Sequence, residues 1–374
     1  MNPRLRELLN FLSDTLDIQH EYEIDNLYKR ALSWELVPRL PLVLKYPVPE
    51  DALFKPYPHS QVFDDPEKML YNELVYAFDS GIVYRELVGD DLPCTIRANF
   101  GTVIVASIFG AKIEIRGENP PWVKPFETKK QFKAALDTET DGFTKGWCSR
   151  TVEMYQFYQE VLNSYPTLKK VTKIVLPDLQ GPLDTAELLR GSEIFLDIVT
   201  EPELVLWSLE KIAKVQVGFA KHLRKYINDG QDNFTHQHGV MIRGNILIRD
   251  DIAIMISAQR YDEMVAPYDE YILREMNGGG IHTCGKFNHL TKSFLKLPSI
   301  SCLDLGNPEM NDIDEIYKLA KNRKVPLVRI EVPVSQLLSG KVLDRFPTGV
   351  VLVHRTFSLI EAKRVMSSYL KNCE

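Results

Sequence analysis

The second half of the chain alternates between helical patterns and short, continuous apolar runs. The run Val350-Val351-Leu352-Val353 is one example. Strands that are apolar on both sides belong to parallel sheets covered on both faces by helices. Together with two earlier runs, we expect about eight strands, starting near Leu40, Leu92, Val171, Asn245, Ile281, Ile300, Val325 and Val350. Eight strands favour an α/β fold of the (β/α)₈ TIM-barrel type over an open sheet.

We expect one domain spanning residues 1–374, with additions before the main barrel strands. Residues 3–36 show helical spacing that ends at Pro38 and Pro41, so residues 1–38 form a helical N-terminal extension. Residues 47 to about 130 are rich in prolines and carry an aromatic loop with Trp122. This stretch is predicted to be a lid or an insertion over the pocket; the alternative is a packed connection that plugs the N-terminal end of the barrel.

Composition and charge narrow the classes of function. The chain has 374 residues and a formal net charge of −6, without the basic stripe of a nucleic-acid-binding protein. No apolar run reaches the roughly 18 residues of a membrane span, and the N-terminus lacks a signal-peptide pattern. The five cysteines are an odd number and widely scattered. These features predict a cytoplasmic protein with reduced thiols that binds neither nucleic acid nor membrane.

The residues that follow the predicted strands are the candidates for chemistry, because TIM barrels act at the C-terminal ends of their strands. His282 and Cys284 are two apart, so at the end of one strand they point to the same face. Nitrogen and sulfur converging on one point is a zinc preference. His354 follows the last apolar run and is the predicted third ligand, with a fourth position left open; alternatively it caps the next helix.

Other polar residues at these ends have predicted roles in catalysis and substrate binding. We assign catalysis to Asp178, Asp250 and Asp251, although an acidic pair before a helix is also a common cap. We assign substrate binding to Gln180, Asn99 and Trp122. His236 and His238 lie in a polar loop before a strand, so we expect them at the opposite, N-terminal end of the barrel or in an excursion from it, in a structural or surface role.

Several stretches together resemble one known family. Ile281-His282-Thr283-Cys284-Gly285 resembles the His-x-Cys-Gly motif of the uroporphyrinogen decarboxylase superfamily, in its cobalamin-dependent methyltransferase branch. Gln180-Gly181-Pro182 and Glu201-Pro202-Glu203 resemble the family's central stretch, and Asp250-Asp251-Ile252-Ala253 resembles the acidic turn after its fifth strand, in the same order. The resemblance covers roughly residues 150 to 370 and implies a single (β/α)₈ barrel.

The resemblance also implies a reaction. A zinc ion would bind a small thiol, lower its pKa and hold it as a thiolate, which attacks a methyl group on a corrinoid (cobalamin) carried by a partner protein. The family's methyltransferases use a later Cys at a position where this chain has His354. Neutral His in place of Cys would make the zinc site one unit more positive and its thiolate less nucleophilic.

Two alternatives remain open. One is a decarboxylase acting on a porphyrinogen-like substrate, but the Arg-Gln-Ala-Gly-Arg motif of the true decarboxylases does not follow the first predicted strand. The other is a barrel that binds a corrinoid or tetrapyrrole without catalysis, since a fold alone does not specify a function.

Overall fold

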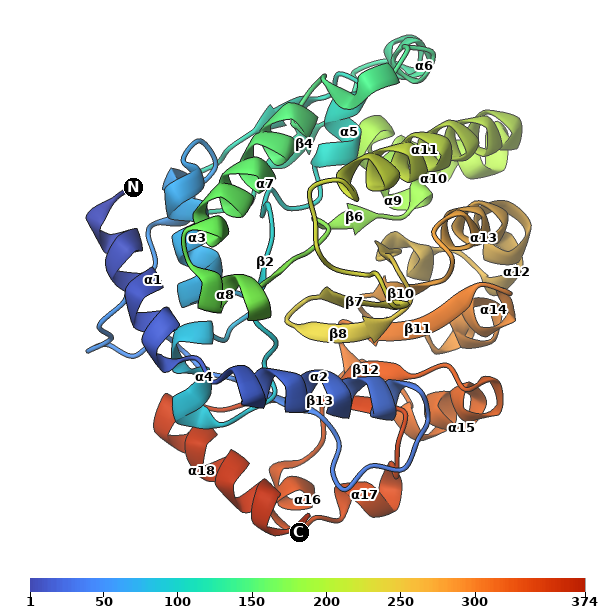
Figure 1. Ribbon diagram of the computed structural model, residues 1–374. Coiled ribbons are helices and arrows are strands. Elements are labelled where there is room, and N and C mark those ends of the chain that lie inside the picture. Colours follow the sequence, from blue (N-terminus) through green and yellow to red (C-terminus); the bar gives the residue numbers. More distant parts are fainter. Residues whose placement is uncertain (374) are drawn as a thin grey trace.

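The computed structural model describes residues 1–373 and has helices arranged around an inner group of strands (Figure 1). The strands of the inner group are β1 (Leu42–Lys45), β2 (Thr95–Ile96), β5 (Lys173–Ile174), β6 (Leu179–Gln180), β9 (Leu247–Arg249), β10 (Gly279–Thr283), β11 (Ile300–Leu305), β12 (Leu327–Ile330) and β13 (Val350–Arg355). Each of the eight stretches expected from the sequence therefore contains a strand.

Seven of these strands form one parallel sheet in the order β1-β13-β12-β11-β10-β9-β6. Strands β2 and β5 pair with each other, also in parallel, but not with this sheet. The arrangement is that of a TIM-barrel-like α/β fold. The expectation of a fully closed barrel is corrected by the hydrogen bonds, which leave the ring open on both sides of the β2–β5 pair.

Two carboxylates account for the opening beside β1. The backbone N–H groups of Leu42 and Leu44 donate to side-chain oxygens of Asp91 and Asp90, each over 2.8 Å. These donors would otherwise pair with the carbonyls of a neighbouring strand. At this edge of β1, carboxylate side chains therefore accept the hydrogen bonds that the backbone of β2 would accept in a closed barrel.

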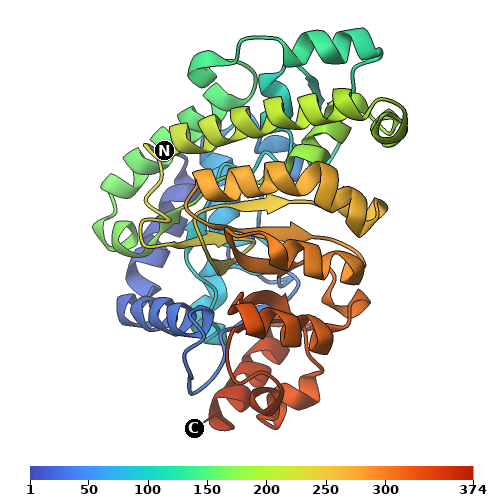
Figure 2. The ribbon, with the colours of Figure 1, turned by 90° about the vertical axis from the view of Figure 1, so that its right-hand side faces the viewer.

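The helices lie outside the strands, as the side view also shows (Figure 2). They are α1 (Pro3–Thr15), α2 (Ile18–Leu32), α3 (Pro66–Val75), α4 (Ile82–Val88), α5 (Ile104–Ile108), α6 (Lys129–Leu136), α7 (Cys148–Asn163), α8 (Pro166–Val171), α9 (Pro182–Arg190), α10 (Glu193–Thr200), α11 (Pro202–Leu223), α12 (Ala258–Arg260), α13 (Ala266–Glu275), α14 (Thr291–Lys296), α15 (Ile313–Arg323), α16 (Val334–Leu338), α17 (Val342–Arg345) and α18 (Leu359–Lys371). Helices α1 and α2 precede the first strand, β1.

Two antiparallel hairpins add to this plan. One is β3 (Lys112–Glu114) with β4 (Trp122–Lys124), and the other is β7 (Phe234–Gln237) with β8 (Val240–Arg243). Residues 103–115 are rich in β-branched residues, a composition typical of a strand, but their first part forms α5. Its residues Ile104 and Ile108 are fully or almost fully buried, so these apolar residues pack in a short helix rather than in a strand.

Helices long and apolar enough to cross a membrane do not occur among residues 1–373.

Candidate functional site

The C-terminal end of β10 brings His282 and Cys284 together, as their spacing predicts. The Sγ atom of Cys284 lies 3.3 Å from Nε2 of His282. An oxygen of Asp251 is the third atom: it lies 3.5 Å from the same Nε2 and accepts a hydrogen bond from the backbone N–H of Cys284 over 2.7 Å. These three ligand atoms all lie within 4.8 Å of one another, which makes a candidate metal-binding group.

Asp251 is held in this position from the helical layer. The buried carboxylate of Asp184, in α9, accepts hydrogen bonds from the backbone N–H groups of Asp251 (2.9 Å) and Ile252 (3.3 Å). These are free donors at the start of a 3₁₀ turn over Ile252–Met255, so Asp184 caps that turn. The capped turn sets the direction in which Asp251 leaves the end of β9.

Gly306, at the end of the neighbouring strand β11, makes room for the side chains of Cys284 and His282. A Cβ atom at this position would lie 2.7 Å from Sγ of Cys284 and 3.0 Å from Cε1 of His282. Real Cβ atoms do not approach sulfur or carbon so closely, so any larger residue would displace Cys284 or the imidazole.

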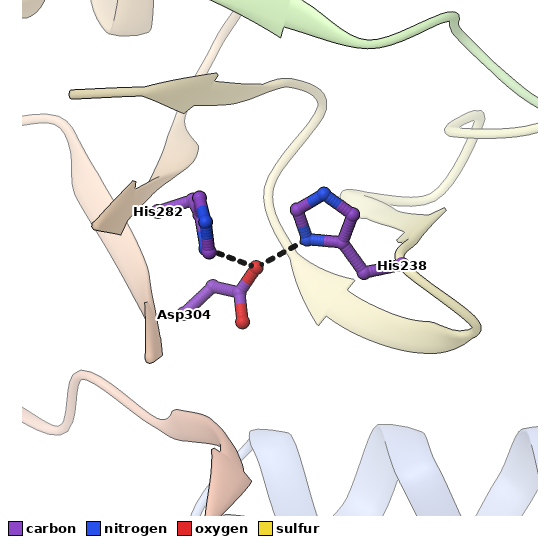
Figure 3. A group of neighbouring side chains, drawn as sticks. All are labelled: His238, His282 and Asp304. Carbon is purple, nitrogen blue, oxygen red and sulfur yellow. Dashed lines mark hydrogen bonds and ion pairs between the residues drawn. The ribbon is translucent and has the colours of Figure 1, made fainter. Parts of the chain in front are cut away.

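A second candidate group lies deeper and shares His282 (Figure 3). Nδ1 of His282 lies 3.0 Å from Oδ2 of Asp304, and Nδ1 of His238 lies 2.7 Å from the same oxygen. The two imidazole rings stand nearly perpendicular, with centroids 4.8 Å apart. His238, His282 and Asp304 thus form a cluster that could also hold a metal ion.

His238 reaches this cluster because it sits at the tip of the β7–β8 hairpin. His238 and Gly239 are the two connecting residues, with φ angles of +52° and +74°. Two successive positive φ angles are what a two-residue type I′ turn requires, and the second position suits glycine. The expectation that His238 lies at the opposite end of the barrel is therefore wrong: the hairpin carries it inward against β9 and β11.

Arg249 determines which nitrogen of His238 carries the proton. Its Nε and Nη2 atoms lie 3.0 and 2.5 Å from Nε2 of His238. A guanidinium only donates, so Nε2 accepts and the proton is on Nδ1, from where it is donated to Asp304. Burial, then Arg249 and Arg329, hold the pKa of His238 well below its usual range, which agrees with a neutral ring.

Charges alternate along a buried chain that leads away from His238. Arg249 contacts Asp178 over 2.6 Å, Asp178 also binds Arg97, and Arg97 lies 3.5 Å from Glu73. Burial alone would raise the pKa of Asp178, but Arg249 and then Arg97 outweigh it and lower that pKa. Each arginine is therefore already neutralised by a carboxylate.

Arg329 connects the cluster to a cavity. Its Nη2 lies 2.7 Å from Nδ1 of His282, and its Nε donates to Oδ1 of Asp304. The guanidinium also lines a cavity of about 230 Å³ together with Lys45, Arg355 and Gly306. A larger hollow of about 630 Å³ near Trp207 lies on the outer helices, away from these residues.

The donors of the two candidate groups differ in their suitability for a metal. In the deeper group, Nε2 of His238 already receives two N–H groups from Arg249, so Nδ1 has to keep its proton. In the outer group, nitrogen, sulfur and oxygen face one point, and Asp304 stands behind His282. A carboxylate behind a ligating histidine is the usual support of a zinc ligand. The outer group of Asp251, His282 and Cys284 fits zinc better.

The Cys284 thiol does not ionise readily on its own. Burial, followed by the charge of Asp251, raises its pKa to about 12. Near neutral pH the sulfur is thus protonated unless a cation binds beside it.

The structure does not bring His354 to either group. Its neighbours in β13, Val353 and Arg355, line the cavity beside Gly306, so His354 faces the opposite side of the strand. There its Nδ1 lies 4.0 Å from Glu331. The predicted third-ligand role of His354 is thus corrected, and the structure places Asp251 at that point.

The remaining predicted residues are spread over the barrel. Asp178 lies in the buried charged chain, and Asn99 joins the far end of it by donating to Glu73 over 3.0 Å. Gln180 is buried on β6, opposite Arg249. Asp250 is fully buried against the helical layer, where burial and then Asp269 raise its pKa well above the ordinary value. Trp122 is 53% exposed on the β3–β4 hairpin and joins neither candidate group.

Sequence reasoning missed His238, Arg249, Arg329 and Arg97 as members of the site. Arg249 immediately precedes Asp250-Asp251, so a strand alternation count starting from Asp251 could have placed it on the same face. His238-Gly239 between two apolar runs is a hairpin signal that predicts the turn, but not its inward direction.

Comparisons with known proteins agree with the fold. No protein-family model matches the sequence. No curated protein matches it either. Among solved structures, the chain is similar to a methyltransferase from Methanosarcina mazei, with a TM-score of 0.64 over 91% of this chain and 96% of that chain, at 14% sequence identity. At this identity the similarity establishes the shared fold.

Proposed function

We propose that this protein is a zinc-dependent methyltransferase that moves a methyl group between a corrinoid, carried on a partner protein, and a small thiol. The observation that carries the proposal is the convergence of Cys284 Sγ, His282 Nε2 and Asp251 Oδ1 at the end of β10. The likeness of the fold to a methyltransferase supports it. Three protein donors with a fourth position open are typical of catalytic zinc rather than structural zinc.

The ligand set balances the charge of the metal. A thiolate from Cys284 and the carboxylate of Asp251 carry two negative charges, which neutralise a divalent ion. With His354 in place of Asp251 the site would be one unit more positive. Zinc bound here would lower the pKa of a thiol in the fourth position. Because zinc and its three protein ligands together carry no net charge, the thiolate would stay nucleophilic.

The cavity beside Gly306 is where we place the rest of the thiol substrate. Lys45 and Arg355 give its wall two cations, and Arg329, which is paired with Asp304, lines it as well, while Glu331 and Glu309 lie toward the same space. Burial, then Arg329, lowers the pKa of Lys45, so this amine gains from a nearby anion. A short thiol with a negative group at its other end suits this wall.

A corrinoid beside the site would supply the methyl group and keep the bonding electron pair, and a zinc ion held by His282, Cys284 and Asp251 would present the thiolate that accepts the methyl group. Water at the sulfur would hinder this step, and we propose that part of residues 47–130 covers the site. The ring of Phe78, in this stretch, lies 5.6 Å from that of His238, which supports a cover on this side. No comparable contact supports Trp122.

A porphyrinogen decarboxylase is the weaker alternative. Its substrate would need several free cations inside the barrel, whereas Arg97, Arg249 and Arg329 are paired with Glu73, Asp178 and Asp304. A barrel that binds a corrinoid without catalysis is the other alternative, and activity separates it from the proposal.

The test uses protein purified without added metal or chelator. We expect about one zinc per chain, and loss of methylcobalamin absorbance with mercaptoacetate that matches the S-methyl product one to one. Cys284→Ala should abolish the transfer, and His354→Gln should leave it unchanged. Zinc binding without transfer to any small thiol would contradict catalysis; full zinc occupancy in the Cys284→Ala protein would contradict the site.

A further inference from the structure

The contact between Arg329 and His282 is incompatible with zinc binding to His282. The two facing nitrogens, Nη2 and Nδ1, are 2.7 Å apart. Nδ1 also lies 3.0 Å from Oδ2 of Asp304, but of these two contacts only the one with Arg329 has hydrogen-bond geometry. Because the guanidinium only donates, Nδ1 accepts in this contact, and the single proton of a neutral imidazole is then on Nε2. Nε2 is the atom that faces Cys284 and Asp251, so in this arrangement the candidate ligand has no lone pair for a metal.

Metal binding therefore requires a change at both ends of the imidazole. When Nε2 gives its lone pair to a metal, the proton has to reside on Nδ1, and two donors would then face each other over 2.7 Å. Asp304 can accept the relocated proton, since its Oδ2 lies 3.0 Å from Nδ1. Arg329 is the group that has to move.

The surroundings of Arg329 provide a place for it to go. The residue lines the 230 Å³ cavity next to Lys45 and Arg355. Its backbone has φ of +61° within β12, where the strand register shifts between Leu327 and Ile330. A non-glycine residue at positive φ is strained and is held only by its contacts. Here those contacts are Asp304 and His282, and metal binding removes one of them.

We infer that Arg329 is a latch: it holds His282 in the tautomer that cannot bind metal, and metal binding releases it into the cavity. The released guanidinium would join Lys45 and Arg355 as a third cation and complete a site for an anion. This inference rests on the proposed function in taking His282 Nε2 as a ligand. By thermodynamic linkage, an anion that draws Arg329 into the cavity strengthens metal binding by the same factor as the metal strengthens anion binding.

The first experiment reads the tautomer in metal-free protein. Nitrogen-15 NMR distinguishes a protonated Nδ1 from a protonated Nε2, and the His282 signals are identified by their loss in His282→Gln. We expect Nε2–H in the unsubstituted protein and Nδ1–H in Arg329→Met. Nδ1–H in the unsubstituted metal-free protein would overturn the inference, whether or not zinc binds at all.

The second experiment measures zinc affinity by competition with a chromophoric chelator. Arg329→Met should bind zinc about tenfold more tightly, within the usual range for coupled sites. Arg329→Lys, which keeps the charge without the bridging geometry, should fall between the two. Arg345→Met is the control, since it removes an arginine that pairs with Asp314 and does not line the cavity, and its zinc affinity should stay unchanged.

Sulfate tests the linkage. At equal ionic strength, replacing chloride by sulfate should raise the zinc affinity of the unsubstituted protein severalfold and leave that of Arg329→Met unchanged. Equal or weaker zinc binding by Arg329→Met would overturn the latch while the zinc site stands. If the unsubstituted protein bound no zinc, the proposed function would fall, and the tautomer measurement would still decide the role of Arg329.

Discussion

His282 and Asp304 lie directly opposite each other in the parallel register of β10 and β11, with 3.0 Å between Nδ1 and Oδ2. Asp304 is also bound by His238 and Arg329, so one buried carboxylate contacts both of these side chains as well as the imidazole of His282. Burial alone would raise its pKa, but Arg329 and then His282 outweigh it and hold that pKa well below the usual range. Four predictions follow from this arrangement and its surroundings.

Zinc affinity should depend on Asp251 and not on His354. Asp251→Asn keeps the size of the side chain and removes its charge, so we expect the affinity to fall about a hundredfold, the upper end of effects seen at metal sites. His354→Gln serves as the control and should bind zinc as the unsubstituted protein does. Chelator competition at one pH checks both. If His354→Gln lost zinc and Asp251→Asn kept it, the ligand assignment would be reversed.

Asp304→Asn should strongly destabilise the fold. It leaves the guanidinium of Arg329 buried without its counter-ion, and breaking a buried pair in this way costs about 3–5 kcal/mol. The matched control is Asp314→Asn, whose partner Arg345 sits in an exposed pair, where about 0–1 kcal/mol is expected. Urea unfolding of the metal-free proteins measures both. Equal losses in the two variants would show that Asp304 has no special structural role.

Gly306→Ala should weaken zinc binding without unfolding the protein. Its Cβ would lie 2.9 Å from Cα and 2.7 Å from Sγ of Cys284, which pushes the sulfur away from His282. We expect about a tenfold loss of affinity, since misplaced support at a metal site costs about 10- to 100-fold. Cys302→Ala, a buried thiol on the same strand, should leave affinity unchanged. An unaltered zinc affinity in Gly306→Ala would show that Cys284 and His282 can shift to accommodate the added methyl group.

Asp90 should make stability fall as pH rises. Burial raises its pKa to about 7, so between about pH 4 and 7 the folded protein binds a proton that the unfolded chain has released. The free energy of unfolding then decreases with pH over this window, by up to about 4 kcal/mol, until the folded-state pKa is passed. Asp90→Asn lacks this slope and should gain relative stability toward pH 8. If the free energy of unfolding changed with pH in the same way in both proteins, the raised pKa of Asp90 would be disproved.

Much of the fold could be predicted from the sequence. All eight strand stretches appear, because strands buried on both faces are continuous apolar runs that stand out from their neighbours. The pair of His282 and Cys284 could be predicted too, since residues two apart in a strand share a face. The closure of the barrel could not, because Asp90 and Asp91 take hydrogen bonds that a backbone strand would normally accept.

The prediction for His354 failed for a related reason. An apolar run such as Val350 to Val353 is buried on both faces, so it gives no sign of which face looks into the barrel. A shift of one residue moves a side chain from one face to the other. Val353 and Arg355 face the cavity and His354 does not, and only the packing of β13 against β1, β12 and α2 decides this.

The sequence by itself determined the alternation of strands and helices, and the convergence of one imidazole and one thiol, since both depend on periodicities of the local chain. Tertiary structure alone decided that Asp251 joins His282 and Cys284, that a hairpin brings His238 to Asp304, and that Arg329 contacts Nδ1 of His282. These are contacts between residues far apart in sequence. Their buried charges are tolerated only because each meets its counter-charge in three dimensions, and no local pattern records that match.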